Sequence, residues 1–302
     1  MQLLAVNHHY YRTDTPPGGI YPISPTMFEE RLNLIGRKYK FIDQRKLLDT
    51  IECPESVYDN LCIITFDDGL KEQMKAFGYL VRRGLSALFF VPTEPLIKGV
   101  VLDVHKLHLI RTIKKDEDLV LNAERYFGVC MKDEVDIDQA SKQYRYDNPD
   151  AQRFKYFLNF VLDAEKRSKW INNIFAETVG DQDKVAQSLY MDKEDIILLA
   201  KHEMLGTHAH THRPLASLDE ETIDSEIFES INILKDVCGK KPFGISYPYG
   251  GPDAISSIVD TIARKHEIKY GFTMIRSINS RADLKRPCML NRIDTNDIKL
   301  YV

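Results

Sequence analysis

Short apolar runs alternate with amphipathic stretches along most of this chain. We expect strands where the apolar runs lie, at 3–6, 61–66, 86–91, 204–208, 244–247 and 270–274. Near-continuous apolar strands separated by helices are typical of a parallel sheet that helices cover. The pattern therefore predicts an α/β fold, in which the sheet is either open or closed into a barrel.

Four stretches between these strands have apolar residues at helical spacing. They lie at 23–39, 70–83, 217–239 and about 253–265. The second should turn Met74, Phe77 and Val81 inward. Ser217 and Glu220 have the spacing of a capping box, so we expect the third helix to begin there.

A long segment between Val91 and Met204 interrupts the alternation, although a strand-to-helix unit needs only a short connection. It is charged and mainly helical in pattern, with Phe154, Phe157, Leu158 and Val161 at helical spacing. No linker rich in Pro, Gly or Ser flanks it. We therefore expect one domain over 1–302 with a mainly helical insertion at about 97–200, and a separate domain is the alternative.

Composition narrows the class of protein. The net charge is −4, so no strong positive field attracts nucleic acid or anionic lipid. No apolar run approaches the ~20 residues that a membrane-spanning helix needs. The N-terminus has no signal-peptide pattern and the five cysteines are scattered without a CxxC pair, so we expect a cytoplasmic protein with reduced thiols.

Three polar motifs directly follow predicted strands. They are Asp67-Asp68-Gly69, the HAHTH segment at 208–212, and the YPYG segment at 247–250. Because the carboxyl ends of parallel strands converge on one face, these motifs should be neighbours in space.

The motifs contain residues that suit a metal site. His208 and His212 with one carboxylate would leave coordination positions open for water, whereas solvated histidines in a polar loop are the alternative. If Asp68 binds a cation, the repulsion between adjacent carboxylates disappears, and Asp67 stays free to act as a base. An acidic turn without function is the alternative for this pair.

Together the motifs resemble the polysaccharide deacetylase, or NodB-homology, family. TFDDG is present unaltered at 65–69, HAHTH stands for H-[ST]-x-x-H, and SYPYG at 246–250 stands for R-x-P-[YF]-G. The resemblance covers roughly residues 1–95 and 200–300. It implies a distorted (β/α) barrel of the NodB-homology type, and the insertion lies outside it.

The resemblance also implies roles for individual residues. Asp67 would be the general base, while Asp68, His208 and His212 would bind a divalent metal, usually Zn²⁺. The backbone N–H of Tyr249 would help to stabilise the oxyanion, and His210 would have no role.

The chain departs from the family pattern in two places. Ser246 replaces an arginine that steadies the base in many relatives, and Arg292 is the candidate substitute, unless it is only an exposed ion-pairing residue. The late histidine that serves as general acid is absent. Some relatives place it after the first strand, so we assign the acid to His9, with His8 as the second choice and a packing role for the pair as the alternative.

A further histidine pair, His105 and His108, has HxxH spacing within the insertion. A second metal site is one interpretation. A substrate-facing lid or a plain amphipathic helix is the other.

The predicted function is metal-dependent removal of an N-acyl group, N-acetyl above all, from a sugar. The expected absence of an export signal favours an intracellular, nucleotide- or lipid-linked precursor of a surface polysaccharide as the partner. The alternatives are an amidohydrolase acting on a non-sugar amide, ureide or formamide, and a sugar-binding homologue without activity.

Overall fold

The computed structural model describes all 302 residues and contains one sheet of eight strands. Every pair of neighbouring strands is parallel, and the order is β7-β6-β5-β4-β3-β1-β8, with the short β2 paired to β3. The strands are β1 Leu3–His8, β2 Lys40–Phe41, β3 Leu61–Phe66, β4 Leu88–Val91, β5 Leu205–Thr207, β6 Gly244–Ser246, β7 Tyr270–Phe272 and β8 Ile293–Asp294.

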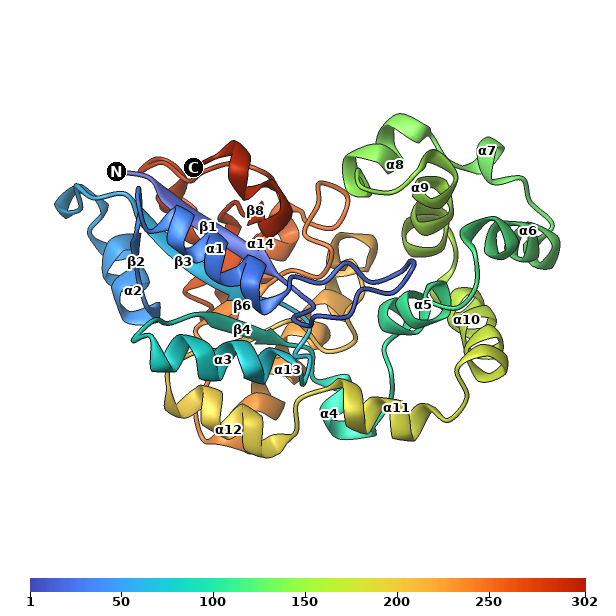
Figure 1. Ribbon diagram of the computed structural model, residues 1–302, viewed down its shortest axis with the longest axis horizontal. Helices are drawn as coiled ribbons and strands as arrows, with labels where there is room; N and C mark the ends of the chain where they lie inside the picture. Colours follow the sequence, from blue (N-terminus) through green and yellow to red (C-terminus); the bar gives the residue numbers. More distant parts are fainter.

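The sheet curls into a distorted barrel with helices around it (Figure 1). One short segment bridges the open side of the barrel. Leu290 pairs with Phe272 of β7, and Ile293 pairs with Val6 of β1. The chain between these two pairings therefore crosses from one edge of the sheet to the other. This crossing carries Arg292 into the barrel, where its side chain is completely buried.

Six helices pack around the outside of the sheet and bury their apolar faces against it or against one another. They are α1 Pro25–Ile35, α2 Gln44–Glu52, α3 Gln73–Arg82, α12 Lys193–Lys201, α13 Glu220–Cys238 and α14 Ser257–Lys265. A tight layer of side chains from the strands fills the barrel itself, among them Leu3, Ile63, Phe90 and Phe272. None of the helices combines the length and the apolar character that crossing a bilayer would demand.

The segment between β4 and β5 contains helices and no strand of the sheet. Before α12 these are α4 Glu94–Lys98, α5 Asp103–Arg111, α6 Asp116–Phe127, α7 Met131–Glu134, α8 Ile137–Gln143, α9 Pro149–Tyr156, a π-helical turn Phe157–Val161, α10 Ala164–Thr178 and α11 Gln182–Leu189. Most of them gather beside the carboxyl ends of the strands (Figure 1). Their core, around Trp170 and Phe154, continues into Tyr10 and Leu70 of the barrel.

One buried charge cluster joins three parts of this helical segment. The Asp147 carboxylate lies 2.7 Å from the Lys155 ammonium and 3.0 Å from the Arg111 guanidinium. Arg111 also forms two hydrogen bonds with Asp116, at 2.7 and 2.8 Å. Each charge is therefore compensated, which a buried ion requires.

The local details correct several expectations. Val81 is 38% exposed, because Leu80 occupies the buried position of its helical face. Val161 is 45% exposed, whereas Phe154, Phe157 and Leu158 are buried as their spacing suggested. The cap of α13 is Asp219, whose side chain accepts from Thr222 N–H, so the helix begins after the expected Ser217. Sequence patterning also missed α2 and the two-residue strands β2 and β8, which are too short to show a period.

Candidate active site

The side chains singled out by the sequence meet at the carboxyl ends of the strands. His9 follows β1, Asp67 follows β3, His208 follows β5 and Tyr249 follows β6. All four line one cavity of about 250 Å³, together with Asp68 and His212. Parallel strands explain this convergence, because every strand presents its carboxyl end to the same face.

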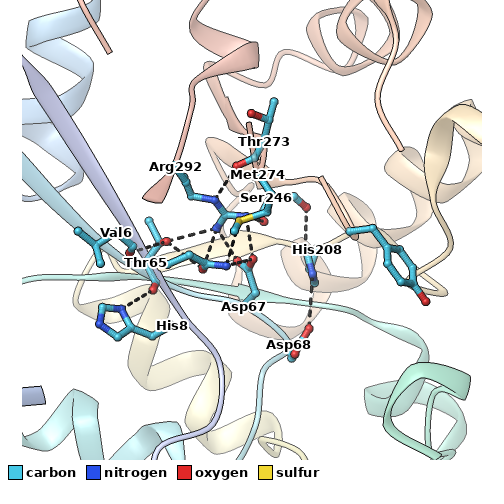
Figure 2. A network of polar contacts seen from close by, with 12 residues as sticks. Val6, His8, Thr65, Asp67, Asp68, His208, Ser246, Thr273, Met274 and Arg292 are labelled. Carbon is cyan, nitrogen blue, oxygen red and sulfur yellow. Dashed lines mark hydrogen bonds and ion pairs between the residues drawn. The ribbon is translucent and has the colours of Figure 1, made fainter. Parts of the chain in front are cut away.

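Asp67 is fixed by a buried, two-pronged ion pair with Arg292. The guanidinium Nη1 and Nη2 atoms donate to the two carboxylate oxygens at 2.9 and 2.8 Å, and neither side chain is more than 3% exposed (Figure 2). Nη2 also donates to Ser246 Oγ at 2.8 Å, so the serine leaves room for the guanidinium and binds it. Arg292 is thus a buried partner of Asp67 rather than an exposed ion-pairing residue.

Asn7 is a partner of Asp67 that sequence reasoning missed. Its Nδ2 atom donates to Asp67 Oδ2 at 3.1 Å, and its Oδ1 atom accepts from Arg292 Nη1 at 3.0 Å. The clue in the sequence is that Asn7 is the one amide near the end of an otherwise apolar first strand. Because the amide presents both a donor and an acceptor, it joins the carboxylate and the guanidinium in one network.

These partners decide the protonation state of Asp67. Burial alone would raise the pKa of this carboxyl group, but the charge and hydrogen bonds of Arg292 outweigh burial and lower the pKa to about 2. Asp67 is therefore ionised at neutral pH.

Asp68, His208 and His212 place three potential metal-ligand atoms close together, and we call these three residues the donor set. The Nε2 atoms of His208 and His212 lie 3.5 and 3.2 Å from Asp68 Oδ1, and the three ligand atoms lie within 4.8 Å of one another. His208 Nδ1–H donates to the Ser246 carbonyl at 2.6 Å, so Nε2 is the ring nitrogen that faces Asp68 (Figure 2). Two imidazole nitrogens, one carboxylate oxygen and an oriented ring fit a catalytic zinc-type site.

The backbone around this donor set is held in unusual conformations. Asp68, Ala209, His212 and Tyr249 have φ angles of 83°, 61°, 60° and 62°. L-residues seldom adopt such angles, and each costs on the order of 1–3 kcal/mol unless the surroundings enforce it. Clustering of four such residues at one place is typical of a functional site.

The backbone N–H group and the hydroxyl group of Tyr249 differ in their partners. Its N–H group donates to no acceptor in the protein, while its hydroxyl group donates to Asn159 Oδ1 at 3.1 Å. The ring lies 5.3 Å from that of His212, measured between centroids. An N–H group left free beside the donor set is available to a ligand oxygen.

The two adjacent histidines after β1 have different surroundings. His8 is 2% exposed and lies between Phe28 and Phe66, with ring centroids 5.1 and 4.9 Å away. Burial lowers the pKa of His8 to about 3, so this ring is neutral and faces the core. His9 instead lines the cavity that contains Asp67.

Three further histidines also have distinct environments. His210 faces away from the donor set, with Nδ1 at 2.9 Å from the Thr93 hydroxyl. His266 pairs with Asp224 at 2.9 Å on the outside of the barrel. His105, for which the sequence suggested a second metal site or a lid, is buried against the donor set, with Nε2 at 3.2 Å from Asp68 Oδ2.

Comparison with known proteins agrees with these motifs. Residues 187–271 match the polysaccharide deacetylase family. This stretch contains the HAHTH and YPYG motifs, whereas Asp67 and Arg292 lie outside it. No curated protein sequence matches the chain.

Solved structures of deacetylases share the fold over nearly the whole chain. The Streptococcus pyogenes deacetylase PplD has a TM-score of 0.61 at 14% identity, covering 97% of this chain and 92% of that one. IcaB from Ammonifex degensii has a TM-score of 0.59 at 15% identity, with 99% and 94% covered. A de-N-acetylase from Aggregatibacter actinomycetemcomitans has a TM-score of 0.61 at 11% identity, with both chains fully covered. The predicted NodB-type barrel and the resemblance to polysaccharide deacetylases are confirmed.

Proposed function

We propose that this chain, which resembles polysaccharide deacetylases, is a metal-dependent hydrolase that removes an N-acyl group, N-acetyl above all, from a sugar. One observation carries the proposal. A carboxylate held by a buried arginine lies directly beside an aspartate–histidine–histidine donor set, and both line the same cavity. Metal-assisted hydrolysis needs such a division between a base and a set of ligands.

Asp68, His208 and His212 would hold the metal, and Zn²⁺ fits their donor atoms. When bound, such a metal polarises an amide carbonyl and lowers the pKa of water from 15.7 to about 7. Asp67 stays ionised beside the donor set and accepts a proton from the attacking water. Arg292 and Asn7 keep its carboxylate in one orientation during this step.

Two further groups complete the reaction. The Tyr249 N–H group donates a hydrogen bond to the carbonyl oxygen as negative charge develops on it. The water oxygen bonds to the carbonyl carbon, the C–N bond breaks, and His9 protonates the departing nitrogen. The products are a carboxylic acid, acetate for an acetyl group, and a free amino sugar.

We also propose that the insertion at about 97–200 belongs to this single domain and shapes the substrate site. A second cavity of about 670 Å³ adjoins the first at His212 and Tyr249, and residues of the insertion such as Lys106, Arg167 and Phe175 line it. That space suits the carrier of a nucleotide- or lipid-linked sugar, or further sugar units. A cytoplasmic location and a role in surface polysaccharide synthesis are part of the proposal.

The test combines metal content with substrate release. Protein loaded with Zn²⁺ should contain about one ion per chain by mass spectrometry and should release acetate from N-acetylated amino sugars. The substrate panel includes free, nucleotide-linked and oligomeric sugars, beside a formamide and a cyclic ureide. Turnover of only the last two would favour a non-sugar amidohydrolase, and metal binding with no turnover at all would favour a binding protein.

Three variants separate the proposed roles. Asp68→Ala should lose both metal and activity, because it removes a ligand. Asp67→Asn should keep the metal and lose about 10²–10⁴-fold in kcat, the contribution of a general base. Asp59→Asn, at an exposed carboxylate paired with Lys40, is the matched control and should change neither. Full activity in Asp67→Asn would refute the assignment of the base.

A further inference from the structure

One side chain of the insertion, His105, contacts the oxygen of Asp68 that His208 and His212 do not face. His105, in α5, is completely buried, and its Nε2 atom lies 3.2 Å from Asp68 Oδ2. His208 and His212 approach the other oxygen, Oδ1. Apart from this contact with Asp68, His105 Nε2 has no polar partner in the protein. The two carboxylate oxygens are thus divided between the barrel and the insertion.

The opposite edge of the His105 ring contacts Tyr190. His105 Nδ1 lies 2.6 Å from the Tyr190 hydroxyl, which accepts a hydrogen bond from Leu102 N–H at 3.0 Å. Because Leu102 already supplies a donor, the proton of the hydroxyl group is available for Nδ1. That arrangement places the ring proton on Nε2, facing Asp68.

Backbone hydrogen bonds tie Tyr190 to the turn that carries Asp68. Met191 N–H donates to the Gly69 carbonyl at 2.9 Å, and Lys71 N–H donates to the Leu189 carbonyl at 2.8 Å. Tyr190 itself forms an antiparallel bridge with Leu70. The end of the insertion therefore runs alongside the residues that directly follow Asp68, and this turn includes the unusual φ of 83° at Asp68.

We propose that His105, oriented by Tyr190, is a positioning residue for the metal site: its Nε2–H group holds Oδ2 of Asp68, so that Oδ1 alone faces the metal. This inference rests on the proposed function, because it assumes that Asp68, His208 and His212 bind a metal. Carboxylate ligands that are hydrogen-bonded in this way bind metals more tightly, because their orientation is set in advance.

The alternative role for His105 is that of a third imidazole ligand. The set of ligand atoms within 4.8 Å of one another comprises Asp68, His208 and His212, and His105 is outside it. The contact of His105 is with the far oxygen of the carboxylate. The geometry therefore favours a partner of the ligand over a ligand.

The experiment measures Zn²⁺ affinity by competition with a chelator. His105→Phe should weaken binding about 10–100-fold, the usual effect of losing an outer partner of a ligand. His105→Gln should recover most of the affinity, because its amide N–H₂ group can still donate to Asp68. Tyr190→Phe should weaken binding about tenfold, at the lower end of that range. His108→Phe is the matched control on the same helix, and its metal affinity should equal that of the wild type, since His108 contacts Tyr10 instead.

X-ray absorption at the zinc edge counts imidazole ligands directly. The wild type and both His105 variants should show two imidazoles, whereas three in the wild type would overturn the proposal in favour of direct ligation. Unchanged affinity in His105→Phe would overturn it as well. If His105→Phe does not fold, Tyr190→Phe decides, and wild-type affinity in that variant counts against the proposal. A wild-type protein that binds no Zn²⁺ would instead refute the proposed function.

Discussion

The pair formed by Asp67 and Arg292 is expected to be strongly coupled, because burial leaves each charge dependent on the other. Arg292 is completely buried and Asp67 is 2% exposed. In Arg292→Met the carboxylate would keep one side-chain donor, Asn7 Nδ2 at 3.1 Å. Breaking a buried pair in this way costs about 3–5 kcal/mol in the free energy of unfolding. Asp67→Asn should lower the free energy of unfolding by a similar amount, because it leaves the buried guanidinium without its counter-charge.

The double variant distinguishes coupling from independent losses. If the two losses were independent, they would add to about 6–10 kcal/mol, much of the 5–15 kcal/mol by which a protein is usually stable. Because the charges depend on each other, Arg292→Met with Asp67→Asn should be little worse than either single variant. Some loss will remain, since Ser246 and Asn7 each lose the guanidinium as a partner. We expect a coupling energy of about 3 kcal/mol or more.

Urea unfolding of all four proteins gives these free energies by linear extrapolation. A chelator must be present, because a bound metal would add stability that differs between variants. The reference is the exposed pair of Lys40 and Asp59, whose atoms lie 2.7 Å apart. That pair should show a coupling of about 0–1 kcal/mol. A coupling at Asp67 and Arg292 as small as the reference would refute the reasoning from burial.

Two further predictions concern the histidines after β1 and a buried carboxylate of the insertion. His9→Ala should lower kcat about 10²–10⁴-fold with little change in stability. His8→Ala should mainly lower the melting temperature, because His8 packs in the core. Equal, negligible effects on kcat in both variants would exclude either histidine as the acid. Burial alone would raise the pKa of Asp147, but the charges and hydrogen bonds of Lys155 and Arg111 outweigh burial and hold the pKa below its ordinary value. The stability from this carboxylate is therefore present above its unfolded pKa and is lost as the pH falls through the folded value. Thermal unfolding measured at decreasing pH should show a shallower loss of stability in Asp147→Asn than in the wild type, and equal slopes would contradict this.

Much of the barrel could be predicted from the chain, because its main strands are apolar runs with almost no polar residues. The predicted runs at 61–66 and 86–91 overlap β3 and β4, and the expected helix at 217–239 contains α13. Shorter elements escaped prediction. The strands β2 and β8 have two residues each, and neither helical nor strand periodicity can be recognised over so short a stretch.

Some residues of the candidate site could likewise be identified from the sequence, and others could not. Asp67, Asp68, His208 and His212 could be identified from local spacing, because parallel strands bring the ends of neighbouring strands together whatever the loops contain. His105 could not be assigned, since HxxH on a helix has no fixed direction relative to a barrel. Asn7 stands out as the amide in an apolar strand, but its role could not be assigned, because that role depends on the pairing of β1 with β3.

The sequence by itself determined the class of fold and the chemical groups at its strand ends, because apolar patterning and residue type are local properties. The tertiary structure decided which charges meet. It turned Arg292 inward through the segment that bridges β7 and β1, buried His8 while leaving His9 in the cavity, and brought His105 of the insertion to Asp68. These contacts join residues far apart in the chain, and only the packing of the barrel and its insertion sets the distances between them.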